Sequence, residues 1–360
     1  MPVPFALAAM FVACASSEQG DVPSTAPAET VDAAVVANLR DEGFHRSRVM
    51  EFAHVLTDLY GPRYANSPSY DGASRWARDT FEDFGLDAAL EPWGEFGYAW
   101  ENRYTSVHIT APQYQPVIGY AQPGTRSTNG SVAGPVGAVD LSAIRTRDDL
   151  NALRERIETS ILLISPERVL VPNFSPQAVR LSDEELSGMV RLEIDPRNNP
   201  AQSADDDLTE PELTRRDIET FLEQQGVAVL VEVGSENVGP MDKGIVHVSG
   251  DGPLPLDEPV PMPRVVIAAE HYNRMMRLLT NETPVEMEIE VRNELSAEDP
   301  VDYNVIAELP GADLAHEVVM IGGHLDAEPA GTGATDNAAG CAIVIEAMRL
   351  LQAAGVEPRR

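Results

Sequence analysis

Cysteine and basic residues are both scarce in this chain of 360 residues. Cysteine occurs only at Cys14 and Cys341, so if Cys14 is modified no internal disulfide can form, and Cys341 is expected to be a small buried hydrophobe. Lys and Arg total 26 against 58 Asp and Glu, which gives a net charge of -32. Because phosphate groups are bound by basic patches, this charge argues against nucleic acid and anionic membrane surfaces as partners.

A long hydrophobic run is also lacking. The apolar run Phe5–Ala13 is shorter than the ~20 residues that cross a bilayer. It ends at Cys14, so we interpret residues 1–14 as an export signal whose end resembles a lipoprotein cleavage box, although no Lys or Arg precedes it. Residues 15–30 are expected to be a flexible tether. The expected location is the periplasm or outer cell envelope, with membrane attachment through a lipidated Cys14, or the extracellular space.

The length allows two structured units, at roughly 100 to 200 residues per domain. Apolar spacing predicts helices over Ser47–Leu59 and Ser74–Phe84 and a strand over Tyr104–Ile109. From Val117 onward, short strands alternate with Gly, Pro and Asp, and the expected strands are Val132–Val139, Ser160–Ile164 and Val227–Val231. Two further helices are expected, one with Ile218, Phe221 and Leu222 on a common face before Gly226, and one over Ala269–Leu279.

Clustered carboxylates at Asp205–Asp207 suit calcium, but the spacing of a calcium loop is absent and a solvated loop is the favoured interpretation. Six histidines show no pairing at metal-binding spacing and are expected to be structural or surface residues: His45, His54, His108, His247, His271 and His316.

Two short motifs near the end of the chain bring an imidazole and two carboxylates into one loop. They are Gly322-Gly323-His324-Leu325-Asp326 and Asp336-Asn337-Ala338-Ala339-Gly340, and they supply ligand types that divalent metals bind. The apolar run Glu317–Ile321 predicts a buried strand before His324. Ala338–Leu351 predicts a helix with Ile343, Ala347, Leu350 and Leu351 on one stripe. A strand, loop and helix in this order are typical of ligand sites in α/β sheets.

Each residue of these motifs also has an ordinary interpretation. A lone histidine such as His324 is often a surface or core residue. Asp336 before a helix can be an N-cap, which is compatible with metal binding through its other oxygen. Asp326 can orient the ring of His324 through the nitrogen that does not bind metal. The glycines at Gly331 and Gly333 do not complete a dinucleotide-binding pattern.

The motifs together resemble a known family. Tyr303–Gly311, Gly323–Asp326 and Asp336–Gly340, with Leu56–Arg63 and Ser67-Pro68 upstream, are similar to the di-zinc exopeptidases that include bacterial secreted aminopeptidases and plasma glutamate carboxypeptidase. The resemblance implies a three-layer α/β/α peptidase domain built from residues 31–116 and 291–360. It also implies an inserted, mostly-β protease-associated domain over 117–290, so that Tyr104–Ile109 and Asn304–Leu309 would be neighbours in one sheet.

The resemblance also assigns roles. It implies that His324 binds one of two zinc ions, that Asp336 bridges both, and that Asp326 is the catalytic residue that orients His324. The substrate would be the end of a peptide, and the resemblance does not decide between the amino end and the carboxyl end.

The family's Glu-Glu pair and later ligands have no counterpart before Arg360. We therefore expect the catalytic domain to be truncated here and this polypeptide to be inactive. The alternative is a non-catalytic binding protein on a peptidase scaffold.

Overall fold

The computed structural model describes residues 32–154, 157–170, 174, 179–189, 213–234, 246, 248–250 and 252–360. The predicted export signal at 1–14, the tether at 15–30, Asp205–Asp207 and His247 lie outside these residues. Among the described helices, none combines the length and the apolar character needed to cross a bilayer.

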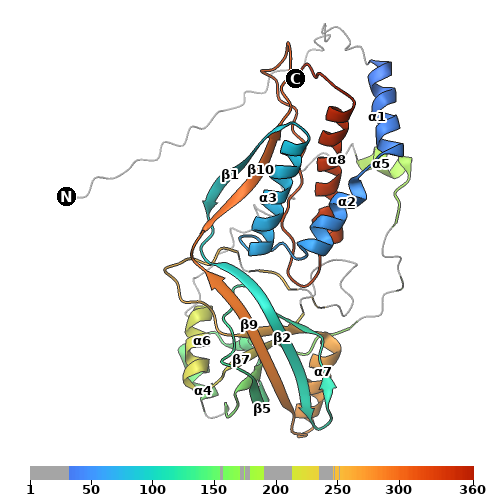
Figure 1. Cartoon of the computed structure of the whole chain (residues 1–360). Helices are drawn as coiled ribbons and strands as arrows, with labels where there is room; N and C mark the ends of the chain where they lie inside the picture. Colours follow the sequence, from blue (N-terminus) through green and yellow to red (C-terminus); the bar gives the residue numbers. More distant parts are fainter. Residues whose placement is uncertain are drawn as a thin grey trace, which may run out of the picture.

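One group of elements is a set of helices beside a short two-stranded sheet (Figure 1). Its helices are α1 (Ala33–His45), α2 (Val49–His54), α3 (Pro68–Asp83) and α8 (Ala339–Ala353), with π-helical turns at Val55–Leu59 after α2 and Ala334–Ala338 before α8. Ser67 caps α3 by accepting the N–H of Tyr70, and Pro68 occupies the first helical position. Phe52, Phe81 and Ile345 form the core between these helices. The predicted helices at Ser47–Leu59 and Ser74–Phe84 are confirmed within these elements.

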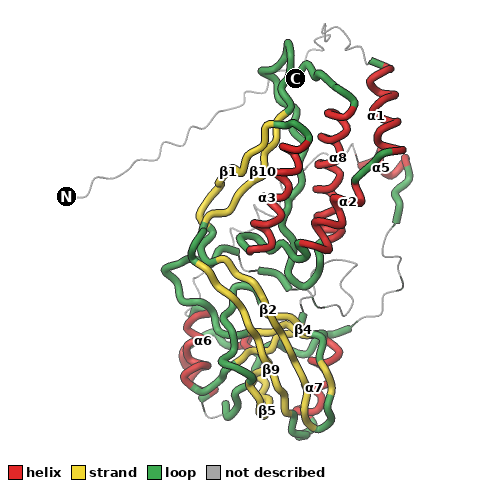
Figure 2. The backbone as a smooth tube through the Cα atoms, viewed as in Figure 1, coloured by secondary structure: helices red, strands yellow, loops and turns green. Residues whose placement is uncertain are grey.

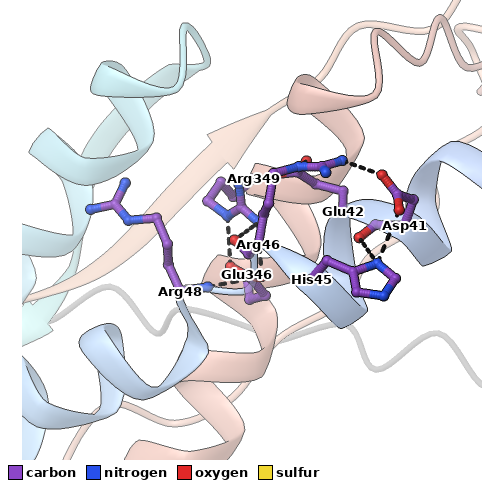
Figure 3. A network of polar contacts seen from close by, with 7 residues as sticks. All are labelled: Asp41, Glu42, His45, Arg46, Arg48, Glu346 and Arg349. Carbon is purple, nitrogen blue, oxygen red and sulfur yellow. Dashed lines mark hydrogen bonds and ion pairs between the residues drawn. The ribbon is translucent and has the colours of Figure 1, made fainter.

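Helix α1 has no buried residue. It lies beside α8, and a polar network there joins side chains of Asp41, Glu42, His45, Arg46, Glu346 and Arg349 with the backbone N–H of Arg48 (Figure 3). Charged groups thus connect the first described helix to the rest of the chain.

The small sheet consists of β1 (Asp87–Glu95) and β10 (Val301–Glu308), which run antiparallel with Asp87 opposite Glu308. The expected pairing of Tyr104–Ile109 with Asn304–Leu309 is therefore wrong. Residues 104–109 belong to β2 (Ala99–Ala111), which pairs with β9 (Glu286–Ser296) in a different sheet.

Burial explains this pairing. Val107 and Ile109 of β2 lie in the same core as Ile289 and Val291 of β9, and matched apolar faces stabilise neighbouring strands.

The second group is built on an eight-stranded mixed sheet with the order β3-β2-β9-β5-β6-β7-β8-β4. Its other strands are β3 (Gln115–Pro116), β4 (Gly119–Ala121), β5 (Val132–Ala138), β6 (Ile161–Leu163), β7 (Val229–Val233) and β8 (Arg264–Ile267). Strands β5 to β8 are parallel, and β5, β6 and β7 confirm three strands predicted from the sequence.

Helices cover both faces of these parallel strands. Ile161 and Leu163 pack in the core that includes Tyr272 of α7 (Ala269–Thr280), whereas Leu162 packs with Leu222 of α6 (Arg215–Gln224). Apolar residues at every position suit strands that are buried on both sides.

Two short helices, α4 (Arg147–Leu153) and α5 (Asp183–Met189), and a 3-10 turn at Leu141–Ala143 complete the described elements. The predicted α/β class is confirmed. The eight-stranded sheet extends past the predicted 117–290 segment on both sides, because it includes β2 and β9, and the protease-associated identity of that segment stays a prediction.

Candidate metal centre

The predicted site residues lie on the connection between β10 and α8, which is drawn as loop from the end of β10 to the turn before α8 (Figure 2). The expected strand Glu317–Ile321 is wrong. No described strand pairs with this segment, and Val318, Val319 and Met320 are 81, 73 and 84% exposed. A β-branched apolar run favours a strand only where a neighbouring strand and a covering layer are available, and the described residues place neither beside it.

His324 lies between the two predicted carboxylates. Its Nδ1 atom is 2.9 Å from Oδ1 of Asp326, and its Nε2 atom is 2.9 Å from Oδ1 of Asp336. All three side chains are exposed, Asp336 most of all. His324 and Asp336 are thus in direct contact, although they lie 12 positions apart in the sequence.

This arrangement is suited to a cation. A carboxylate only accepts hydrogen bonds, and a neutral imidazole donates from one nitrogen only, so both contacts are hydrogen bonds at once only when His324 is protonated. A metal ion between Nε2 and Asp336 would take the place of that proton.

Ligands of a tetrahedral zinc ion lie about 3.4 Å from one another, compared with 2.9 Å here. The two atoms are therefore about half an ångström closer together than two ligands of one zinc ion would be.

Asp326 contacts the nitrogen of His324 that faces away from Asp336. A carboxylate in this position fixes which ring nitrogen is free to bind a metal. The structure therefore leaves Nε2 as the ring nitrogen that faces Asp336, and the predicted roles of His324, Asp326 and Asp336 stay predictions with a compatible geometry.

Asp336 does not act as the helix cap that its sequence position suggests. Helix α8 begins at Ala339 after Ala338, and no side chain caps its first turn. Asp336 instead lies within the preceding turn, with extended backbone angles, so its carboxylate is available to His324.

The turn before α8 and the first turn of α8 hold the backbone of His324. Asn337 Nδ2 and Cys341 Sγ donate to the carbonyl of His324 at 3.4 and 3.1 Å. A Cβ atom on Gly323 would lie 3.1 Å from Asn337 Nδ2, so a larger residue there would require the Asn337 side chain to shift by a few tenths of an ångström. Burial raises the pKa of the Cys341 thiol to about 11, against the influence of Arg63, which agrees with the prediction of a neutral, buried cysteine.

The expected apolar stripe of α8 is wrong in its phase. Ile343 is 62% exposed, whereas Cys341, Ala342 and Ile345 are buried. These three residues pack against α2, α3 and the turn at Val55–Leu59. The packing partners decide which face of this apolar helix is buried.

The described residues, His324, Asp326 and Asp336 among them, contain no group of three or more His, Cys, Asp and Glu side chains placed to hold one metal ion. His316 is exposed, 3.9 Å from Glu317. His45 and His54 contact acidic neighbours one helical turn away, and His108 stacks on Tyr114.

Sequence reasoning included Arg63 only as the last residue of the Leu56–Arg63 segment and assigned it no role. It is fully buried and donates to backbone carbonyls of the loop that carries His324 and leads to Asp336. Its sequence signals were its position directly after the Tyr60-Gly61-Pro62 turn and its place in that segment.

Comparison with known proteins places the end of the chain in context. Residues 304–360 match the model of Peptidase family M28. Carboxypeptidase Q of Mus musculus is 30% identical over 99 residues, which are 28% of this chain and 21% of that protein. Leupeptin-inactivating enzyme 1 of Streptomyces exfoliatus is 41% identical over 58 residues, or 16% of this chain and 13% of that protein. The chain thus spans about a fifth or less of the length of these relatives.

A similar solved structure is that of a peptidase M28 precursor from Shewanella amazonensis SB2B. It superposes with a TM-score of 0.51 at 22% identity, covering 91% of this chain and 65% of that one. This likeness concerns the fold.

Proposed function

We propose that this chain, whose residues 304–360 match the model of Peptidase family M28, is part of a zinc-dependent exopeptidase that hydrolyses terminal peptide bonds. The observation that carries the proposal is the contact of His324 with Asp326 on one ring nitrogen and Asp336 on the other. A zinc ion bound there would polarise the scissile carbonyl and lower the pKa of a bound water.

The chain's own residues have separate tasks in this proposal. His324 would bind the metal through Nε2, and Asp336 would supply the second ligand and, in a two-ion site, bridge both ions. Asp326 would orient the imidazole from the opposite side. The exposure of all three side chains is compatible with the entry of a peptide end.

The number of ligands sets the expected affinity. Zinc sites in proteins use about three or four protein ligands, and the described residues supply two. We therefore expect weak zinc binding and no peptidase turnover from this polypeptide.

Zinc titration by calorimetry tests the proposal, with His324→Ala compared to His316→Ala. His316 is an exposed histidine in the same loop and serves as the matched control. We expect binding to be lost in His324→Ala and retained in His316→Ala. Equal binding by the parent and His324→Ala would refute the site, and turnover with two tightly held zinc ions would refute the expectation of inactivity.

A further inference from the structure

Arg63 is a charged residue that is entirely buried, and it lies where the metal-binding loop meets the turn after α2. Its donors reach five backbone carbonyls: Nε to Leu325 at 2.8 Å, Nη1 to Leu56, Gly61 and Thr332 at 2.6, 2.7 and 3.1 Å, and Nη2 to Gly333 at 3.2 Å. These carbonyls come from three segments of backbone: residues 56–61, residue 325 and residues 332–333.

The positions of the acceptors relate Arg63 to the site. Leu325 is the residue between His324 and Asp326, and Thr332 and Gly333 come directly before the turn that carries Asp336. The backbone of Arg63 adds a further contact, because its carbonyl accepts the N–H of Ala327 at 2.9 Å. One side chain therefore joins the two stretches of backbone from which His324 and Asp336 project.

The chemistry of this contact requires arginine. A guanidinium presents several N–H groups in a rigid planar fork, whereas a lysine ammonium is a compact, mobile donor. Burial lowers the pKa of Arg63, and the nearby Cys341 and Asp326 oppose this shift, but a guanidinium stays charged in proteins. A charge buried this deeply persists because carbonyl oxygens surround it.

We infer that Arg63 is a positioning residue for the metal centre. It fixes the carbonyls of Leu325, Thr332 and Gly333 so that the side chains of His324 and Asp336 meet. This inference rests on the proposed function, since it deepens the account of the same site.

The principal test compares zinc affinity in Arg63→Lys, Arg75→Lys and Ile289→Ala, each measured on the whole chain below its unfolding temperature. Arg75 is a surface arginine of α3 paired with Asp71, so it controls for the exchange itself. Ile289 is buried in the other sheet, so it controls for lost stability. We expect Arg63→Lys to weaken zinc binding about tenfold to a hundredfold, as loss of a residue supporting metal ligands does, and both controls to bind zinc as the parent does.

A purely structural role for Arg63 predicts another result. Arg63→Lys would then lower the unfolding temperature as Ile289→Ala does, with zinc affinity equal to that of the parent. This result would overturn the inference.

Hydrogen exchange provides a second readout that needs no metal. We expect the Nε–H of Arg63 in the unaltered chain to exchange far more slowly than that of Arg75, and Arg63→Lys to accelerate exchange of backbone amides at 325–333 relative to Arg75→Lys. Exchange of the Arg63 Nε–H at the rate of Arg75 would overturn the inference, even if Arg63→Lys does not fold. If the parent binds no zinc, the proposed function fails, while these exchange rates still decide whether Arg63 holds the loop.

Discussion

Arg349 of α8 donates to Glu42 of α1 across 2.8 Å, and the same guanidinium contacts the buried Glu346 at 2.8 and 3.0 Å (Figure 3). Its Nη2 atom also reaches the carbonyl of Arg46. Burial opposes ionisation of Glu346, but hydrogen bonds from Arg349 and Ser47 lower the pKa of this carboxyl overall. One arginine thus neutralises a carboxylate inside the helical group and attaches a helix that has no buried side chain of its own.

Replacing Arg349 by Met should lower the free energy of unfolding by about 3 kcal/mol, because removal of one partner leaves a buried carboxylate unpaired. Urea denaturation at pH 7 measures this change. Arg75→Met is the matched control, since its pair with Asp71 is exposed, and its effect should stay below about 1 kcal/mol. Similar losses in the two variants would contradict this account.

Asp302 of β10 predicts a pH dependence of stability. The residue is 3% exposed, and burial raises its pKa to about 6, against hydrogen bonds from the backbone of Tyr303 and Asn66. The unfolded chain has a value of about 3.9. Because the pKa of Asp302 is higher in the folded chain, the folded state binds a proton at this carboxyl more tightly than the unfolded state does. The stabilisation from protonated Asp302 is therefore complete below about pH 4 and is lost as the pH rises through about 6.

The Asp302→Asn variant, which cannot ionise, should lack this loss. Between pH 4 and pH 7 the unfolding free energy of the parent should fall relative to Asp302→Asn by about 2 kcal/mol. Urea denaturation of both proteins across this range measures the difference. A constant difference would mean that Asp302 does not titrate in this way.

Two glycines of the loop between β10 and α8 offer a matched comparison. Gly333 has a φ of +61°, and a Cβ atom there would lie 2.2 Å from Cβ of Ala327 and 2.9 Å from Nη2 of Arg63. Gly322 has no atom within 4 Å of such a Cβ. Gly333→Ala should therefore destabilise the chain by about 1 to 3 kcal/mol, whereas Gly322→Ala should change stability by less than about 0.5 kcal/mol. Thermal unfolding measures both, and equal effects would show that the loop adapts freely.

Asp326 should matter for zinc affinity more than for stability. Asp326→Asn weakens the hydrogen bond to Nδ1 of His324 that orients the ring. We expect zinc affinity to fall about tenfold to a hundredfold, as it does when carboxylates that support metal-bound histidines are replaced. Calorimetric zinc titration measures it. Asp313→Asn is the control, because Asp313 is an exposed acid of the same loop that pairs with Arg359. Unchanged affinity in Asp326→Asn would refute the orienting role.

Several elements could be predicted because their information is local. The spacing of apolar residues in 160–164 and 227–231 identified strands β6 and β7, which are buried on both faces. The proximity of His324 and Asp326 also follows from local sequence, since side chains two residues apart in an extended loop point the same way. The imidazole of His324 and the carboxylate of Asp326 therefore lie next to each other, as the short motif predicts.

Other features depend on contacts between distant segments. The run Glu317–Ile321 has the composition of a strand, yet it lacks a described partner and stays exposed. The pairing of β2 with β9 joins residues nearly 200 positions apart, and composition does not select between such partners.

The sequence by itself determined the residue types of the candidate site, the α/β class and several of the helices and strands, because propensity, capping and periodicity act over a few residues. Only the tertiary structure decided that Asp336 meets Nε2 of His324, that α8 buries Cys341 and Ile345 and exposes Ile343, and that Arg63 lies beneath the loop. These outcomes follow from which surfaces pack together and which buried donors find acceptors, and both depend on the whole folded chain.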